Sequence, residues 1–73
     1  MFTIKAYSND GTMFLIEASE VRINPNRSMV EYMTPLIPEN LQCLLVDSNS
    51  RNFLAAYIEN QSGKTIETLR AAT

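Results

Sequence analysis

Among the residues of this sequence, the carboxylates could take part in the widest range of reactions. The 73 residues include eight of them against six basic residues, with no histidine and a single cysteine. Two carboxylates that face each other across a cleft could act as general acid and base, as in glycosidases. A chain of this length, however, can hardly enclose a pocket of roughly several hundred Å³ and still keep a core. We therefore predict that the protein is not an enzyme, and we assign no catalytic residue.

Cys43 is the one candidate nucleophile. A reactive thiolate needs a neighbouring base, normally a histidine, which this chain lacks. Apolar residues dominate positions 41–46, so we expect Cys43 to be a small buried hydrophobic residue in a reducing, cytoplasmic compartment. Structural zinc prefers thiolate and imidazole ligands, so we predict no metal site. Gly11 and Gly63 are the only glycines and lie too far apart for a phosphate-binding loop, and we predict no cofactor.

Aromatic residues beside basic ones could stack the bases of a single-stranded nucleic acid on a small barrel. Such neighbours occur at two places, and the candidate nucleic-acid residues are Lys5, Tyr7, Arg51 and Phe53. Phosphate binding needs clustered lysine and arginine. Here the six basic residues are scattered and the net charge is −2. Binding to nucleic acid is therefore an alternative rather than the leading hypothesis.

The first third of the chain is typical of antiparallel strands. Residues 2–7 alternate apolar and polar types with a period of two, and Asp10-Gly11 is a strong signal for a hairpin turn. The return strand over 12–18 is almost continuously apolar, which predicts that both of its faces are partly covered. After a bend at Ser19, the alternation resumes.

The segment from Thr34 to Pro38 contains two prolines, Pro35 and Pro38. It must be irregular, because prolines so close together break the pairing of a strand. Its two apolar residues, Leu36 and Ile37, could fill one end of the core or form an exposed patch for a protein partner. Residues 29–33 before it read as a short strand. The candidate protein interface consists of Tyr32, Met33, Leu36 and Ile37.

Residues 38–61 are compatible with two readings. Positions 41–46 could form a buried strand, or a short helix within 38–46 that has Pro38 in its first turn. Positions 53–60 fit a helix within 51–61 that Ser50 would cap. They also fit a strand that turns at 60–63 and returns over 64–69. We favour this hairpin.

Together these segments predict a mainly β chain of about five to seven short strands, in a small antiparallel sheet or open barrel. One short helix is compatible with this prediction. The alternative is an α+β fold with a helix in 38–46 or 51–61. The length predicts a single domain over residues 1–73. The N-terminus lacks the pattern of a signal peptide and no apolar run is long enough to cross a bilayer, so we expect no membrane contact. Free sheet edges and a small core without disulfides favour association with another chain.

The segment from Phe53 to Ile66 resembles a hairpin that recurs in small uncharacterised accessory proteins of tailed bacteriophages. It consists of a strand containing Ala56-Tyr57-Ile58, the turn Glu59-Asn60-Gln61-Ser62-Gly63 and the return Lys64-Thr65-Ile66. The resemblance implies a small protein that is made in a bacterial host cell and acts by binding a host macromolecule. It assigns no functional residue.

We therefore predict a small non-enzymatic protein-interaction module, encoded by a phage or mobile element. It would inhibit or modulate a host protein involved in defence or in handling nucleic acids, and its partner would be that host protein or a second copy of itself. The alternatives are a small β-barrel that binds single-stranded nucleic acid and an oligomeric structural or assembly protein.

Overall fold

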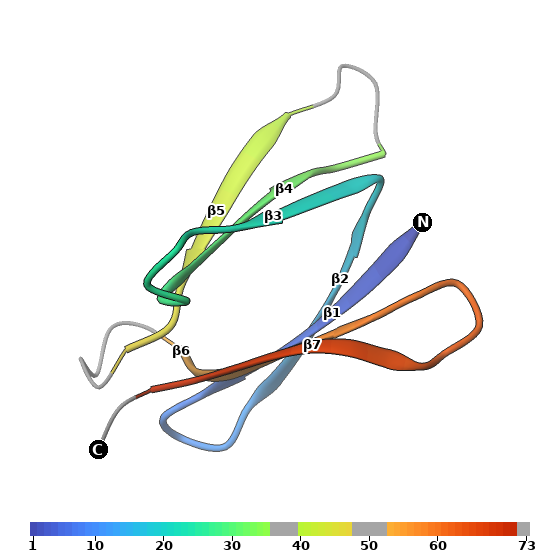
Figure 1. Cartoon of the computed structure of the whole chain (residues 1–73). Helices are drawn as coiled ribbons and strands as arrows, with labels where there is room; N and C mark the ends of the chain where they lie inside the picture. Colours follow the sequence, from blue (N-terminus) through green and yellow to red (C-terminus); the bar gives the residue numbers. More distant parts are fainter. Residues whose placement is uncertain (36–39, 48–52, 72–73) are drawn as a thin grey trace.

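The structure, a computed structural model, describes residues 1–35, 40–47 and 53–71, which form β-strands joined by turns, and the paired strands are antiparallel (Figure 1). The strands are β1 (Phe2–Ser8), β2 (Met13–Ala18), β3 (Glu20–Ile23), β4 (Met29–Met33), β5 (Leu41–Leu45), β6 (Phe53–Glu59) and β7 (Thr65–Arg70). The prediction of a mainly β chain with up to seven strands is confirmed. The two helical alternatives, within 38–46 and within 51–61, are wrong, because β5 and β6 occupy these segments. Since the described residues contain no helix, none of them provides a helical membrane span.

The strands form two sheets that pack face to face. One has four strands in the order β2-β1-β6-β7, and the other has three in the order β3-β4-β5 (Figure 1). An isolated parallel bridge between Val46 and Phe53 links β5 to the start of β6. The described ladders otherwise stay within one sheet, so the arrangement is an open one and not a closed barrel.

The first hairpin forms because its turn satisfies its own polar groups. Gly11 takes the left-handed region at φ 89°, which costs a glycine little. The Asp10 carboxylate accepts hydrogen bonds from the Thr12 N–H at 2.9 Å and from the Ser8 hydroxyl. The Ser8 N–H donates to the Thr12 carbonyl at 2.9 Å and closes the turn. The hairpin predicted from Asp10-Gly11 is thus confirmed.

These contacts make the first hairpin sensitive to acid. The bond from Ser8, and then those from Thr12, lower the pKa of Asp10 from 3.8 to about 2. Its turn contacts are therefore complete above pH ~4 and are lost as the pH falls through about 2. We expect an NMR titration of the carboxyl to give this low pKa. Melting temperatures should fall more between pH ~4 and ~2 in the wild type than in Asp10→Asn, and equal falls would contradict this assignment.

The second hairpin, β6–β7, confirms the favoured reading of residues 53–69. Asn60 organises its turn, because its side-chain oxygen accepts bonds from the N–H groups of Ser62 and Lys64, both at 3.0 Å. Gly63 again takes positive φ, at 86°. Asn60 forms these hydrogen bonds with residues two and four positions further along the chain, so the turn can be predicted from the local sequence.

Ser19 is the point at which the chain passes from one sheet to the other. Its N–H donates to the carbonyl of Met33 at 2.8 Å, so β2 ends beside β1 and β3 begins beside β4. The predicted bend is confirmed, but the predicted cover of β2 is wrong. Met13, Phe14 and Leu15 are 42%, 48% and 63% exposed. The reason is that β2 is an edge strand of the larger sheet, and the smaller sheet covers little of it.

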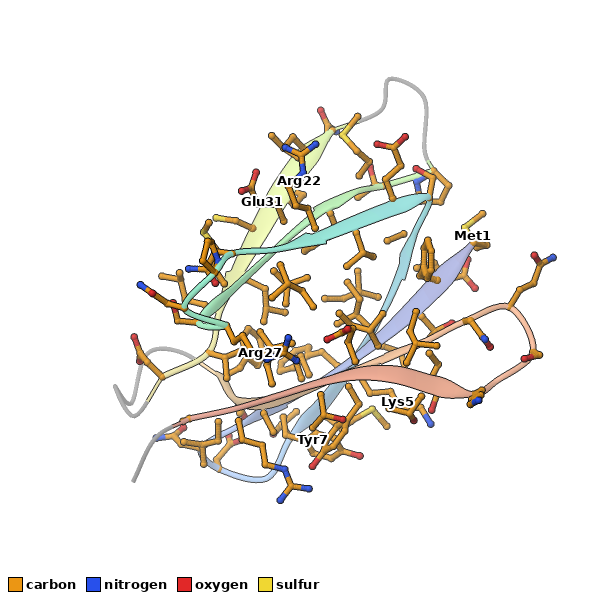
Figure 2. The ribbon with its side chains drawn as sticks, in the orientation of Figure 1. Met1, Lys5, Tyr7, Arg22, Arg27 and Glu31 are labelled. Carbon is orange, nitrogen blue, oxygen red and sulfur yellow. The ribbon has the colours of Figure 1, made fainter. Side chains whose placement is uncertain are left out.

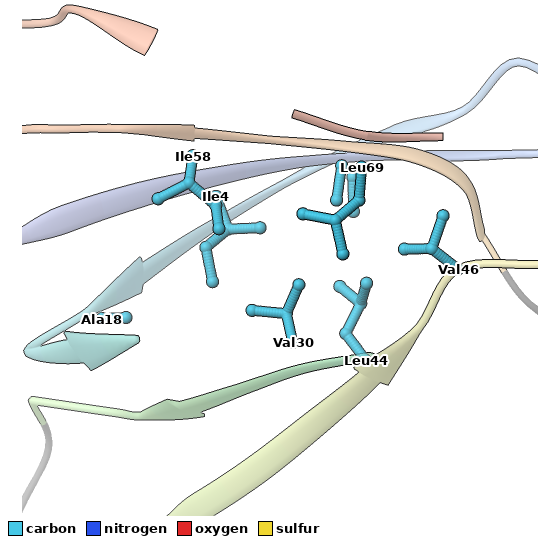
Figure 3. Close-up of a cluster of buried hydrophobic side chains, with 9 residues drawn as sticks. Ile4, Ala18, Val30, Leu44, Val46, Ile58 and Leu69 are labelled. Carbon is cyan, nitrogen blue, oxygen red and sulfur yellow. The ribbon is translucent and has the colours of Figure 1, made fainter. Parts of the chain in front are cut away.

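The core lies between the two sheets and consists of small and medium aliphatic side chains (Figure 3). Its largest fully buried members are Ile4, Ile58, Leu69 and Val30, which come from both layers. Arg27, in the turn between β3 and β4, ties the layers together at one margin. Its guanidinium donates to a Glu67 carboxylate oxygen at 2.8 Å and to the Thr68 carbonyl at 2.9 Å.

Candidate functional site

The outer face of the three-stranded sheet carries an unusual number of apolar side chains for a surface. The register of this sheet places Met33 beside Leu41, and Met29 beside Leu45, with Cys43 between the two rows. All of them lie on the face opposite to the buried Val30 and Leu44 side chains, because side chains alternate along a strand. We call this surface the apolar face, and it comprises Met29, Met33, Leu41, Cys43 and Leu45.

Exposure of this face is greatest along β5. Leu41 is 65% exposed and Leu45 is 43% exposed, and Cys43 between them is exposed as well. The expectation that Cys43 is buried is therefore wrong. The period of two turns Leu44 and Val46 inward, and it must then turn Cys43 outward.

Charged residues accompany the apolar face on the neighbouring strands. Arg22 on β3 pairs with Glu31 on β4, and Glu31 lies opposite Cys43 on β5. Figure 2 shows Arg22 and Glu31 on the side of this sheet that points away from the core. β5 itself contains no charged residue. The apolar face thus surrounds one acidic residue, because Glu31 lies between Met29 and Met33 on β4. Arg22 on β3 lies beside Glu31 on one side, and the face ends at the neutral edge strand β5 on the other.

The structure separates the residues predicted as a protein interface. Met33 belongs to the apolar face, whereas Tyr32 points to the opposite side of the sheet and packs against the core. Burial, and to a lesser extent Cys43, raise the pKa of Tyr32 above its ordinary 10.0. Leu36 and Ile37 lie outside the described residues, so the loop that contains them stays a prediction.

Four members of the apolar face were missed from the sequence: Met29, Leu41, Cys43 and Leu45. A signal for them was present, because positions 29 and 33 share a face of one strand and positions 41, 43 and 45 share a face of the next. That signal could be used only once 41–45 was known to be a strand.

The outer face of the four-stranded sheet forms a second distinct surface, with aromatic rings and cations. Tyr7 and Tyr57 meet edge to face, with ring centroids 5.7 Å apart. The Arg70 guanidinium lies 5.8 Å from the centre of the Tyr57 ring. Lys5 pairs with the Glu59 carboxylate at 2.9 Å, a contact that raises the pKa of the lysine. Figure 2 shows Lys5 and Tyr7 on the side of the molecule opposite to Arg22 and Glu31.

Only part of the predicted nucleic-acid set lies on this second surface. Lys5 and Tyr7 lie there, but Phe53 packs against the core and meets Phe14 edge to face at 5.7 Å. Arg51 lies outside the described residues. Tyr57 and Arg70, which complete the surface, were missed because their strands come from the far end of the sequence.

Two shallow grooves are lined by described residues, and one of them reaches the apolar face at Met33 and Leu41. One, of about 550 Å³, runs between β3 and β7 and has Val21, Ile23, Ile58 and Ile66 among its apolar lining. The other, of about 460 Å³, lies at the end of the three-stranded sheet and includes Glu31 with the apolar Leu41. Among the residues that the structure describes, no group of three or more histidine, cysteine or acidic side chains could hold a metal ion. That the protein is not an enzyme stays a prediction.

Comparison with protein-family models, with curated protein sequences and with solved structures finds no match to this chain. No residue role can therefore be carried over from a relative. The function has to be argued from the two outer faces and from the strand edges that border them.

Proposed function

We propose that this protein is a small protein-interaction module, and that the apolar face of the three-stranded sheet is its binding surface. The observation that carries the proposal is the exposure of Leu41, Cys43 and Leu45 on one neutral strand, beside Met29 and Met33. Contiguous apolar side chains on a soluble domain mark surfaces that another molecule covers. The exposure of these side chains supports the interaction hypothesis. We therefore propose the binding surface on the three-stranded sheet and not in the loop at 36–37.

The chemistry of the apolar face suits a protein partner. Covering a leucine side chain gains about 1.5–3 kcal/mol, so covering Leu41, of which 65% is exposed, would gain about 1–2 kcal/mol. Methionine side chains adapt to irregular partner surfaces because they are unbranched. Glu31 within the face and Arg22 beside it on β3 would select the orientation of the partner through complementary charges.

The partner we propose is a protein of a bacterial host cell, met in the cytoplasm, whose action the module inhibits or modulates. The resemblance of the β6–β7 hairpin to phage accessory proteins motivates this choice of partner. The net charge of −2 suits a basic partner, such as an enzyme that handles nucleic acids, although the charge is too small to imitate DNA.

A matched pair of leucine variants tests the apolar face. Leu41 on β5 and Leu15 on β2 are 65% and 63% exposed, and each lies on an outer face of an edge strand. We expect Leu41→Lys to weaken capture of a stoichiometric partner from bacterial lysate by at least about tenfold, because a charge is placed inside the covered area. Leu15→Lys should capture as well as the wild type.

Thermal melts of both variants check that each is folded. Equal capture by the two variants, or a loss with Leu15→Lys alone, would place the binding surface elsewhere. Failure of the wild type to capture any partner would contradict the proposed function itself.

The second surface supports a second candidate, binding of single-stranded nucleic acid. Tyr7 and Tyr57 offer rings for stacking, and Arg70 offers a cation beside them. Lys5 is neutralised by Glu59, so Glu59→Gln should strengthen binding of a labelled oligothymidine several-fold at low salt. Tyr57→Ala should abolish that binding. If fluorescence anisotropy detects no binding by either the wild type or Glu59→Gln, this candidate is wrong.

A further inference from the structure

One side of the sandwich is open between β3 and β7, which are edge strands of the two sheets (Figure 1). The groove of about 550 Å³ lies on this side. Its apolar lining comes from both layers, with Val21 and Ile23 from the smaller sheet and Ile58 and Ile66 from the larger. Ile66 is 44% exposed, so part of this lining is uncovered.

The backbone edge of β3 that borders the groove is free. The Asn24 N–H donates to the Met29 carbonyl at 3.2 Å, so these two residues form a hydrogen-bonded pair that continues the ladder between β3 and β4. Pairs with and without hydrogen bonds alternate along an antiparallel ladder, so Arg22 also bonds to β4. The N–H and C=O groups of Val21 and Ile23 then point away from β4. Within the described part of the chain, no residue bonds to them.

The other side of β4 gives the same assignment. The Val46 N–H donates to the Ser28 carbonyl at 2.7 Å, and the Thr34 N–H donates to the Asn40 carbonyl at 3.1 Å. The even-numbered residues of β4 therefore bond to β5. The odd-numbered residues of β4 are left to bond to the even-numbered residues of β3.

The edge of β7 differs, because Arg27 reaches across the groove to it. The guanidinium donates to the Thr68 carbonyl at 2.9 Å and to the Glu67 carboxylate at 2.8 Å. Figure 2 shows Arg27 between the β3–β4 turn and β7. One carbonyl of the β7 edge is thus already bonded, and β3 is the edge that offers all of its outward backbone groups.

We propose that an extended segment of a protein partner adds to the free edge of β3 as an antiparallel strand. Its inward side chains are apolar and enter the groove. Its outward side chains include an acidic residue opposite Arg22 and a basic residue opposite Glu20. In such strand addition the main-chain hydrogen bonds give affinity and the alternate side chains give specificity. The proposal goes beyond the proposed function, because it concerns the edge of β3 and not the apolar face.

The charges on the outer side of β3 favour this partner. Glu20 and Arg22 are exposed, and neither forms an ion pair with another described residue. Glu20 lies opposite Met33 on β4, so its neighbour in the ladder supplies no cation. A strand added to the free edge places one residue directly opposite each charge, and opposite charges at such positions stabilise a sheet.

A second copy of this chain fits the groove less well than a separate strand. Two copies of β3 could also set Glu20 opposite Arg22, but their inward residues, Val21 and Ile23, already pack against their own core. Those side chains would leave the groove unfilled. A separate strand brings its own apolar side chains to it.

Two capped peptides of the same composition test the charges. Bound antiparallel with its central valine opposite Val21, the peptide TVEVKVT sets its glutamate opposite Arg22 and its lysine opposite Glu20. The peptide TVKVEVT sets like charges opposite each other. In an NMR titration at low salt we expect TVEVKVT to bind with a dissociation constant of roughly 0.1–1 mM, at least about fivefold tighter than TVKVEVT. Equal binding, tighter binding of TVKVEVT or no binding of either would overturn the proposal.

A charge-swapped protein is the matched variant for these peptides. Glu20→Lys/Arg22→Glu changes only exposed side chains, and thermal melts check that it is folded. We expect it to prefer TVKVEVT over TVEVKVT by a similar factor. An unchanged preference would mean that the peptides bind elsewhere.

Methylation of the peptide backbone tests the edge. The amide of the central valine of TVEVKVT donates to the Val21 carbonyl in the proposed register, whereas the amide of its lysine points away from β3. We expect methylation of the valine amide to abolish the peptide-induced shifts of the Val21 and Ile23 amides, and methylation of the lysine amide to preserve them. Equal effects of the two methyl groups would contradict pairing with β3.

A pair of lysine variants tests the groove. Ile66 lines it and is 44% exposed, and Leu54, which lies outside it, is 39% exposed. We expect Ile66→Lys to weaken binding of TVEVKVT at least about fivefold, because it places a charge in the apolar lining. Leu54→Lys should bind like the wild type. Equal affinities of the two variants would show that the peptide side chains do not enter the groove.

Two further outcomes separate this proposal from others. Shifts of the Val21 and Ile23 amides that depend on protein concentration without peptide would indicate a second copy on this edge and contradict the proposal. Failure of the peptides to bind would leave the lysate experiment with Leu41→Lys and Leu15→Lys unaffected, because those residues lie on β5 and β2.

Discussion

Leu69→Ala should unfold a large part of the population at 37 °C. Leu69 on β7 is 1% exposed and is one of the four largest fully buried side chains of the core. Replacing a buried leucine by alanine costs about 2–5 kcal/mol, because transfer energy is lost and a cavity remains. A domain of this length has only about 4–11 kcal/mol of stability in total. We therefore expect the melting temperature to fall by about 10 °C or more.

Leu15→Ala is the control for this variant, because it removes the same atoms from a side chain that is 63% exposed. It should change the free energy of unfolding by less than about 1 kcal/mol. Thermal and urea unfolding followed by circular dichroism measure both variants. A loss of less than about 1 kcal/mol for Leu69→Ala would mean that the core does not depend on the packing of β7 against the smaller sheet.

Asn24→Ala should have the second-largest effect, because one side chain holds the turn that joins β3 to β4. Its oxygen accepts hydrogen bonds from the N–H groups of Ser28 at 2.8 Å and of Met29 at 2.9 Å, and its amide donates to the Ser28 hydroxyl at 3.1 Å. These bonds are partly buried, so their loss leaves two backbone donors without that acceptor. We expect a cost of about 1–3 kcal/mol.

Asn26→Ala, at an exposed position of the same turn, is the matched control and should cost less than about 0.5 kcal/mol. Urea unfolding measures the difference between the two alanine variants. Asn24→Ala should also reduce partner capture, since the turn positions β4, which carries Met29 and Met33 of the apolar face. Equal stabilities of the two variants would show that backbone pairing alone holds this turn.

Local chemistry made several elements predictable. The turn at Asp10-Gly11 and the turn from Asn60 to Gly63 form through side-chain bonds that span at most four residues. The alternation in residues 2–7 predicted β1, and the polar Ser19 predicted the bend between the sheets. In each case the structure uses a contact between near neighbours, which the sequence displays directly.

The candidate sites were less predictable, because they depend on which strands become neighbours. Lys5 meets Glu59, and Tyr7 meets Tyr57, only because β1 pairs with β6 across about fifty residues of chain. Phe53 was predicted to stack bases because it is an aromatic residue close to Arg51 in the sequence, and the register instead turned it toward the core. Cys43 was predicted to be buried because its neighbours are apolar, and the alternation of β5 exposes it.

The sequence by itself therefore determined a histidine-free, mildly acidic β chain with two hairpins, since composition and turn chemistry are local properties. The tertiary structure decided which strands lie at an edge and which face of each strand is covered. The burial of a side chain is a property of what packs over it, and here that cover comes from distant segments. For this reason much of the apolar runs at 13–16 and 41–45, which the sequence presents as core, lies at the surface, and only Ile16 and Leu44 of these runs pack in or against the core.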